Sequence, residues 1–177
     1  MVYNPKDFLS NGHEVDKCRP RLQKYCNGIG LDIGCGSMTE ERGYPKENKI
    51  VPHAIGVDKG YTNIMCLAND LHWFNNDTLD FVFSSHLLEH IAKYKEALKE
   101  WWRVLAYGGN LVLYLPHADL YPCIDTGVGN QDHKYDFTPK MILNVLNNLG
   151  FNFDILHIQT HDEGNEYSFD FAVRKTI

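Results

Sequence analysis

Apolar, strand-like stretches alternate with helical ones along this chain, and this alternation constrains the fold more than any other feature. The stretch LDFVFSS at Leu79–Ser85 is rich in strand-forming residues. Tyr94–Leu105 then carries apolar side chains at helical spacing, and we expect Gly108 and Gly109 to end that helix. Further strands are expected at residues 30–33, 53–58, 64–68 and 110–116. Strands that alternate with helices pair in parallel, so the pattern predicts an α/β, doubly wound sheet.

The C-terminal third of the chain contains a long loop, a helix and two strands. Residues 117–137 are polar, aromatic and glycine-bearing without periodicity, which is typical of a functional loop. A helix should begin after Thr138 as the capping residue and end at Gly150. The last two expected strands, 152–158 and 166–174, are joined by a connection too short for a parallel crossover, so we expect them to be antiparallel.

The composition is that of one globular domain with a sizeable core, with 177 residues of which 44% are hydrophobic and 23% charged. The five cysteines form no CxxC pair, which fits reduced thiols in the cytoplasm. No apolar run reaches the ~18 residues of a membrane span, and the N-terminus has no apolar signal core. The net charge of −6 and the lack of a long basic run argue against a nucleic-acid partner. We therefore expect a cytoplasmic protein without membrane contact, whose oligomeric state the sequence leaves open.

The stretch LDIGCG places Asp32, Gly34 and Gly36 directly after the first expected strand, where glycines let the backbone approach a ligand. Asp58 ends the second expected strand, where a carboxylate can accept hydrogen bonds from both hydroxyls of a ribose. A dinucleotide fingerprint would have a third glycine where Thr39 stands, and a pyrophosphate disfavours a nearby carboxylate. S-adenosylmethionine, which carries an ammonium and a sulfonium, therefore fits this turn better than a nicotinamide dinucleotide, the alternative cofactor.

Six motifs, in this order and spacing, make the chain resemble the class I S-adenosylmethionine-dependent methyltransferases, and among them the methyltransferase type 11-like group. They are LDIGCG, AIGVD, NDL, LDFVFSSHLLEHI, EWWRVLAYGGNLVLYLP and HKYDFTPKMILNVLNNLGF. The resemblance covers a core of residues 28–175 after an N-terminal segment of residues 1–27, and it implies that residues 1–177 form a single domain. It also implies a Rossmann-like, seven-stranded sheet of order 3-2-1-4-5-7-6 with the last strand antiparallel.

The resemblance further implies a cofactor site at the carboxyl ends of the strands. The residues that it assigns to S-adenosylmethionine are Asp32, Gly34, Cys35, Gly36, Asp58, Lys59, Asp70, Leu71, Ser84 and Ser85. The first four would surround the methionine half and the next two would lie at the ribose. The following two would meet the adenine, and the two serines would border the methionyl portion and the mouth of the substrate site.

Methyl transfer from a sulfonium is a direct in-line displacement, so it needs alignment and desolvation rather than a protein nucleophile. Cys35 is therefore expected only to fill a tight turn. A base would help to remove a proton from a hydroxyl or amine acceptor. The loop after the fifth strand supplies His117 and His133 as predicted bases and Asp119 as a predicted substrate contact, with Asp136 as a further candidate base. Loops at the carboxyl ends of strands bind ligands in open α/β sheets.

The motif HLLEHI raises the question of a metal. His86, Glu89 and His90 are spaced to share one helix face. The motif resembles the Glu-x-x-Glu-His metal cluster of the small-RNA 2′-O-methyltransferases and the ubiquinone-pathway O-methyltransferases. Here His86 replaces the first glutamate, and LEH is frequent in metal-free relatives. We therefore expect no metal and predict that His86 faces the substrate.

The polar segment Ser37–Pro52 departs from the amphipathic helix that is usual in the family, and we expect an irregular helix or a flap over the cofactor there. The sequence as a whole predicts a methyltransferase that uses S-adenosylmethionine and acts on a small-molecule or sugar-type acceptor. Two alternatives stay open. One is a module that binds S-adenosylmethionine or S-adenosylhomocysteine without turnover, and the other is a metal-assisted O-methyltransferase of RNA or small phenols.

Overall fold

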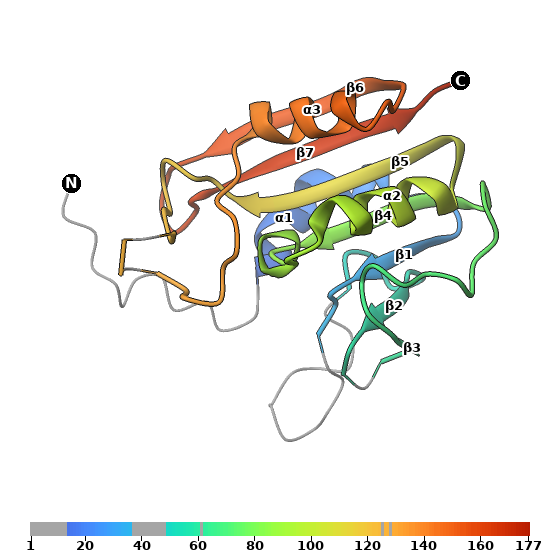
Figure 1. Ribbon diagram of the computed structural model, residues 1–177, viewed down its shortest axis with the longest axis horizontal. Coiled ribbons are helices and arrows are strands. Elements are labelled where there is room, and N and C mark those ends of the chain that lie inside the picture. Colours follow the sequence, from blue (N-terminus) through green and yellow to red (C-terminus); the bar gives the residue numbers. More distant parts are fainter. Residues whose placement is uncertain (1–13, 37–48, 61, 125, 128) are drawn as a thin grey trace.

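A seven-stranded sheet runs through the computed structural model, which describes residues 14–36, 49–60, 62–124, 126–127 and 129–177 (Figure 1). The strand order is β3-β2-β1-β4-β5-β7-β6, which confirms the predicted order. The strands are β1 (Gly30–Ile33), β2 (Ile55–Asp58), β3 (Ile64–Met65), β4 (Leu79–Ser85), β5 (Leu105–Pro116), β6 (Phe153–His161) and β7 (Ser168–Lys175).

The directions of the strands also agree with the prediction. Strand β1 pairs in parallel with both β2 and β4, and β4 pairs in parallel with β5. Strand β7 is antiparallel to its two neighbours, β5 and β6. The carboxyl ends of β1, β2, β4 and β5 therefore lie at one edge of the sheet, where open α/β sheets bind ligands.

Helices cover both faces of the sheet. Helices α2 (Tyr94–Val104) and α3 (Pro139–Asn148) lie on one face, and α1 (Glu14–Leu22) with the short η2 (Gln23–Tyr25) lies on the other (Figure 1). Side chains alternate along β5 accordingly. Leu111, Leu113 and Leu115 pack toward α2 and α3, whereas Val112 and Tyr114 pack toward α1. Helix α1 contributes apolar side chains to the part of the core on its face of the sheet.

The prediction that Gly108 and Gly109 end a helix was wrong. Helix α2 already ends at Val104, and β5 begins at the next residue. Gly108 has φ +84° within β5, at the place where the register with β4 shifts. A Cβ at Gly109 would lie 2.8 Å from the carbonyl oxygen of Leu79. Both glycines therefore lie at an irregularity of β5, where its backbone passes close to that of β4.

The predicted cap of the helix after Thr138 and the antiparallel pairing of the last two strands are confirmed. The Thr138 hydroxyl accepts a hydrogen bond from the Met141 amide at 3.2 Å and caps α3, and Gly150 follows that helix with φ +75°. The described residues of the loop 117–137 contain no helix or strand. The irregular helix or flap expected at Ser37–Pro52 concerns mainly residues 37–48, which lie outside the described residues.

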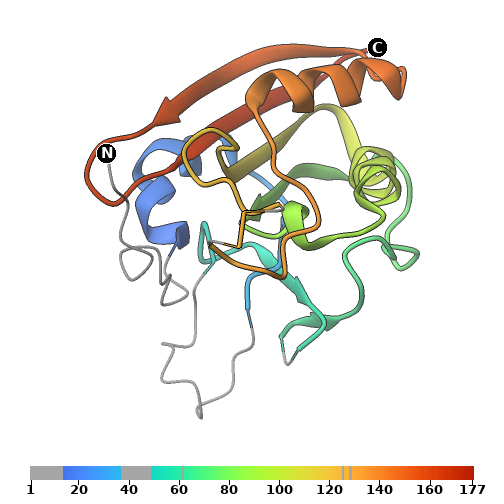
Figure 2. The same cartoon turned by 60° about the vertical axis from the view of Figure 1, so that its left-hand side comes forward.

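The loop 117–137 lies beside the short η4 (Leu88–His90), as Figure 2 shows. The amides of Lys134 and Tyr135 both donate to the carbonyl oxygen of Glu89, at 2.7 and 3.3 Å. At its start, the His117 amide donates to the Tyr167 carbonyl at 2.9 Å. These bonds hold the loop at the carboxyl edge of the sheet.

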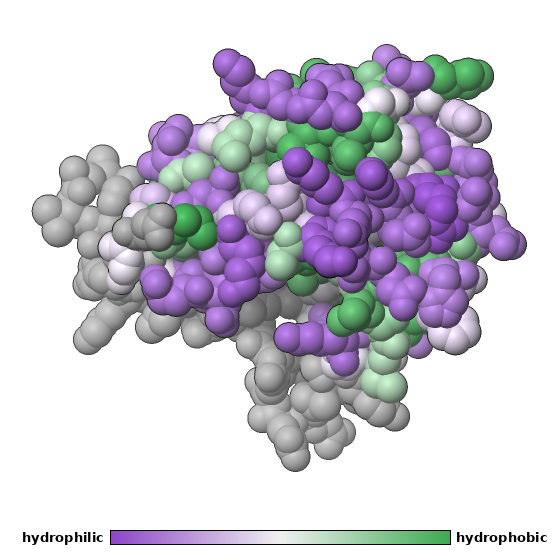
Figure 3. All heavy atoms as spheres, in the orientation of Figure 1, coloured by the Kyte–Doolittle hydropathy of each residue, from purple (hydrophilic) through white to green (hydrophobic). Residues whose placement is uncertain are grey.

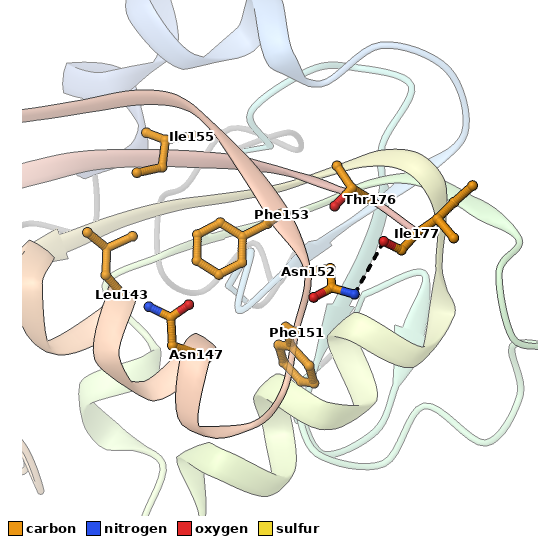
Figure 4. A pocket seen from close by; sticks show the side chains of 8 residues that line it. All are labelled: Leu143, Asn147, Phe151, Asn152, Phe153, Ile155, Thr176 and Ile177. Carbon is orange, nitrogen blue, oxygen red and sulfur yellow. Dashed lines mark hydrogen bonds between the residues drawn. The ribbon is translucent and has the colours of Figure 1, made fainter.

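A hollow lies at the other end of the sheet, away from the carboxyl ends of β1, β2, β4 and β5. It is formed between α3 and the first residues of β6 (Figure 4). Leu143, Phe151 and Phe153 line it, and Asn152 Nδ2 closes one side by donating to the carbonyl oxygen of Ile177 at 3.2 Å. Figure 3 shows this side of the molecule as mainly hydrophilic, with apolar side chains gathered in its upper part, where α3 lies. Because Phe153 pairs with Lys175 at the far end of β7, this hollow is remote from the ligand-binding edge.

Replacing Thr138 tests the cap of α3. Thr138→Ala should lower the free energy of unfolding by about 1 kcal/mol, because one amide of the first turn loses its acceptor. Thr138→Ser retains a hydroxyl and should stay within about 0.5 kcal/mol of the parent. Urea unfolding followed by circular dichroism measures both. An equal loss in the serine variant would attribute the effect to the methyl group instead of the cap.

Candidate functional site

A cavity of about 290 Å³ lies at the carboxyl ends of β1 and β2, near the lower limit of roughly 300 Å³ for small-molecule pockets. Its lining residues are Ile33, Gly34, Val57, Asp58, Lys59, Cys66, Leu67, Ala68, Asn69, Leu87, His90 and Ile91. Three of these, Gly34, Asp58 and Lys59, were predicted from the sequence to bind a cofactor. The cavity thus combines an apolar wall with one carboxylate and one ammonium.

The turn after β1 is fixed by two glycines with positive φ. Gly34 has φ +81°, its amide donates to the Val57 carbonyl at 2.7 Å, and a Cβ there would lie 2.7 Å from Leu87 Cδ2. Gly36 has φ +84°, and a Cβ there would meet nothing within 4 Å. Gly34 therefore needs both the backbone conformation and the missing side chain, whereas Gly36 needs only the conformation.

Asp58 joins the turn after β1 to the turn after β2. Its Oδ2 accepts from the Gly36 amide at 3.0 Å and its Oδ1 from the Gly60 amide at 2.9 Å. A carboxylate offers about four acceptor positions, so two amides leave room for further donors. The position at the end of β2, in the wall of the cavity, suits a ligand with two adjacent hydroxyls.

Asp32 is buried beneath the turn and does not line the cavity. Its Oδ2 accepts from the Ile50 amide at 2.6 Å. Burial raises the pKa of this carboxyl from 3.8 to about 7, although the Ile50 amide and the charge of Lys49 oppose that shift. The structure therefore places Asp32 as a support that ties the residues before β2 to β1.

The predicted adenine residues also lie away from the cavity wall. Asp70 contacts His72 Nδ1 at 2.5 Å, and this hydrogen bond lowers the pKa of its carboxyl. Leu71 is fully buried in the core. Their neighbour Asn69 lines the cavity instead.

The remaining predicted cofactor residues face backbone or core. Ser84 donates its hydroxyl to the Ile33 carbonyl at 2.9 Å, and the buried Ser85 hydroxyl has no partner among the described residues. Cys35 Sγ lies 3.2 Å from Thr62 Oγ1, and burial raises the pKa of its thiol to about 11. A thiol that stays protonated at neutral pH agrees with the prediction that Cys35 fills space in the turn.

Sequence reasoning missed most of the apolar wall. The residues missed are Ile33, Val57, Cys66, Leu67, Ala68, Asn69, Leu87, His90 and Ile91. The sequence predicted a strand at 64–68, but β3 spans only Ile64–Met65. The chain leaves the sheet after Met65, so the next four residues turn into the cavity wall. The early end of a short edge strand leaves no periodic pattern in the sequence from which it could be predicted. His90 had a signal in the motif HLLEHI, but that motif suggested a metal ligand and not a cavity wall.

The prediction that His86 shares a helix face with Glu89 and His90 was wrong, because His86 precedes η4 and has φ +46°. Its imidazole ring nevertheless lies close to the Glu89 carboxylate. His86 Nε2 lies 3.0 Å from Ser168 Oγ, and its Nδ1 lies 3.8 Å from Glu89 Oε1. Burial lowers the pKa of this imidazole to about 3, so the ring is neutral.

The structure brings His133 to the cavity through His90. The two imidazole rings lie 4.7 Å apart between centroids, and His90 lines the cavity. His133 Nε2 is also 4.0 Å from Glu89 Oε1. Burial lowers the pKa of His133 to about 4.

The other loop candidates do not line the cavity. His117 Nδ1 accepts from the Asp119 amide at 3.2 Å, and the His117 ring packs edge-on against Phe169. The Asp119 side chain is 84% exposed. Asp136 Oδ2 accepts from the amides of Cys123 and Ile124, both at 3.0 Å, and so shapes the loop.

No helix in the described part of the chain is long and apolar enough to span a membrane.

Comparison with known proteins shows what this chain resembles in sequence and in fold. Residues 31–113, just under half of the chain, match the family model described as a methyltransferase domain. No curated protein matches the sequence. The match begins at β1 and ends within β5, and it therefore contains the whole cavity described above. The resemblance to class I methyltransferases is confirmed.

Solved structures with the same architecture are distant in sequence. An S-adenosylmethionine-dependent methyltransferase from Archaeoglobus fulgidus is 18% identical with a TM-score of 0.66, over 94% of this chain and 95% of that one. The 1,6-didemethyltoxoflavin-N1-methyltransferase of Burkholderia thailandensis is 14% identical with a TM-score of 0.67, over 98% and 87%. An S-adenosylmethionine-dependent methyltransferase from Mesorhizobium loti is 17% identical with a TM-score of 0.63, over 92% and 98%. At these identities the comparison shows the fold.

The buried carboxyl of Asp32 predicts a pH dependence of stability. Its folded-state pKa is raised, so the protonated form favours folding, and this contribution is complete below about pH 4 and is lost as the pH rises through 7. The stability of the parent relative to Asp32→Asn should therefore fall between pH 4 and pH 8, by on the order of 2–4 kcal/mol. Urea unfolding at several pH values measures this difference. A difference that does not change with pH would contradict the assignment.

Proposed function

We propose that this chain, which has the fold and the family match of class I S-adenosylmethionine-dependent methyltransferases, transfers a methyl group from S-adenosylmethionine to a small-molecule or sugar-type acceptor. The observation that carries the proposal is the cavity at the carboxyl ends of β1 and β2, in which Gly34 opens the backbone and Asp58 presents a carboxylate. Both features match the needs of an adenosyl ligand, which has two ribose hydroxyls and a flat base.

In this proposal each part of the cavity binds one part of the cofactor. Asp58 accepts hydrogen bonds from the ribose hydroxyls, with Lys59 beside it. Leu67, Ala68 and Asn69 border the adenine, and this assignment replaces the expectation for Asp70 and Leu71. The methionine half lies along the turn at Gly34. Asp32 supports that turn from below through its bond to the Ile50 amide.

The chemistry requires little of the protein beyond placement. S-adenosylmethionine supplies an electrophilic methyl group, which the acceptor's lone pair attacks as the carbon–sulfur bond breaks. The acceptor's own proton must then leave. The walls of the cavity exclude water and align the two reactants. His133 belongs on the acceptor side, because it contacts the cavity residue His90, whereas His117 has no such link among the described residues.

The size of the acceptor follows from what covers the ligand-binding edge. One loop, 117–137, lies over the carboxyl ends of β4 and β5 and is held to Glu89. The chain has a net charge of −6, which gives no attraction to a nucleic-acid backbone. One similar structure was solved with 1,6-didemethyltoxoflavin and S-adenosylhomocysteine bound, which shows that the fold can serve a small heterocyclic acceptor in that protein. A small acceptor suits such a compact edge.

Calorimetry with S-adenosylhomocysteine tests the cofactor. The parent should bind it, and Asp58→Ala should weaken binding by about 1–3 kcal/mol, roughly 5- to 150-fold, because hydrogen bonds to a charged group are lost. Asp154→Ala, which removes an exposed carboxylate from β6, is the matched control and should bind like the parent. NAD should not bind. Tight binding of NAD without binding of S-adenosylhomocysteine would overturn the proposal.

The two glycines of the turn provide a second test. Gly34→Ala should abolish measurable binding of S-adenosylhomocysteine, because its Cβ would force Leu87 into the cavity. Gly36→Ala has the same backbone strain, about 1–2 kcal/mol, but its Cβ meets no atom within 4 Å, so it should lose stability and keep more affinity. Calorimetry and urea unfolding on both variants separate the two effects. Equal loss of affinity would place the ligand away from Leu87.

Turnover distinguishes an enzyme from a binding module. Methyl-labelled S-adenosylmethionine incubated with a panel of amines, phenols and sugars should yield a labelled acceptor. Binding of S-adenosylhomocysteine without transfer to any of these would favour the module that holds the cofactor without turnover.

A further inference from the structure

Glu89 is the most unusual charged residue in the described part of the chain. Its side chain is 0% exposed, and neither carboxylate oxygen has a hydrogen-bond partner there. A buried carboxylate without a donor or a cation is costly, and such groups are rare in folded proteins. The side chains nearest to its carboxylate are mostly imidazoles, and their nitrogens lie too far away to donate a hydrogen bond.

Three imidazole nitrogens surround one oxygen of this carboxylate. Glu89 Oε1 lies 3.8 Å from His86 Nδ1, 4.0 Å from His90 Nε2 and 4.0 Å from His133 Nε2. A divalent ion that bonds nitrogen and oxygen at about 2.0–2.2 Å separates its ligand atoms by roughly 3–4 Å. The spacing of these atoms is therefore that of groups placed around an ion.

The ligand atoms of Glu89, His90 and His133 all lie within 4.8 Å of one another. These residues come from η4 and from the loop 117–137. The two segments are joined by hydrogen bonds from the Lys134 and Tyr135 amides to the Glu89 carbonyl.

We propose that Glu89, His90 and His133 bind a divalent transition-metal ion, and that this ion holds the acceptor beside the cofactor. His86 supports the site from the other side, since Ser168 fixes its Nε2 and leaves Nδ1 facing the Glu89 carboxylate. Two imidazoles and one carboxylate suit zinc, manganese, iron or cobalt better than magnesium or calcium. This revises the expectation from the sequence that no metal binds here.

A neighbouring group of potential ligands, Cys123, His133 and Asp136, is less suited to the same ion. Asp136 already accepts from two backbone amides, and Cys123 donates its thiol to the Tyr121 carbonyl. Burial also raises the pKa of that thiol to about 11. Glu89 has no such competing bonds, so His133 belongs to the site at Glu89.

The role of the ion rests on the proposed function, although its binding does not. His90 lines the cofactor cavity and belongs to the metal site, so an ion there would lie next to the transferable methyl group. Three protein ligands leave positions open for an acceptor oxygen or nitrogen. A bound ion lowers the pKa of such a group and fixes its lone pair toward the methyl carbon. His133 would then act as a ligand of the ion, which differs from the base role predicted from the sequence.

Cobalt titration tests the site directly. The full chain, treated with a chelator and dialysed, is titrated with Co²⁺ while visible absorption and heat are recorded. We expect one ion per chain with a d–d spectrum, and competition by Zn²⁺ but not by Mg²⁺. Glu89→Gln and His133→Gln should each weaken Co²⁺ binding by more than about 100-fold. Glu163→Gln and His53→Gln remove exposed residues of the same types and should bind like the parent.

The variants are first checked for folding by circular dichroism and for S-adenosylhomocysteine binding without metal. Absence of Co²⁺ binding to the parent, or equal binding by Glu89→Gln, would overturn the metal site. A folded chain that binds Co²⁺ but not S-adenosylhomocysteine would overturn the cofactor proposal and keep the metal site. If an amine acceptor binds to the metal-free parent and Glu89→Gln abolishes that binding, Glu89 compensates an organic cation, and the metal proposal fails.

Discussion

The parallel pairing of β1 with β2 on one side and β4 on the other is the constraint on which the site depends. Because both pairings have the same direction, the chain must leave β1, β2 and β4 at one edge of the sheet. The hydrogen bond from the Gly34 amide to the Val57 carbonyl, 2.7 Å long, then fixes where the turn after β1 begins. The cavity is lined by the turn after β1 and by the chain at the end of β2, and Asp58 joins the two turns.

The sequence predicted the parts of the fold that depend on local pattern and on strand alternation. The strand directions and the cap at Thr138 were predicted from residues whose preferences act over a few positions, whereas the strand order was predicted from the resemblance to class I methyltransferases. The failures have a different origin. Gly108 and Gly109 were assigned to a helix end because glycine commonly stops helices, but Gly108 has a positive φ within β5 and Gly109 lies against the Leu79 carbonyl. Local sequence does not record which backbone will cross a strand.

The residues predicted for the candidate site also fall into two groups, those that line the cavity and those that do not. Gly34, Asp58 and Lys59, which were predicted to bind the cofactor, line the cavity, since each lies at or just after the end of a strand. Asp32 and Ser84 lie one residue before the ends of β1 and β4, and their side chains turn to backbone groups in the interior. A motif fixes the path of the main chain more firmly than the direction of every side chain on it. The wall at residues 66–69 could not be predicted, because it depends on where a short edge strand ends.

The segment η4 has a consequence for how the two halves of the site respond to ligands. Its last residue, His90, lies in the wall of the cavity, while the carbonyl of Glu89 holds the loop 117–137. These residues are adjacent in the chain, so the cavity and the loop share one short piece of backbone. If a ligand in the cavity displaces that backbone, the loop held by the Glu89 carbonyl is displaced with it. Thermodynamic reciprocity requires a ligand in the cavity and a molecule beneath the loop to alter each other's affinity by the same factor, so the order in which the two reactants arrive leaves the stability of the ternary complex unchanged.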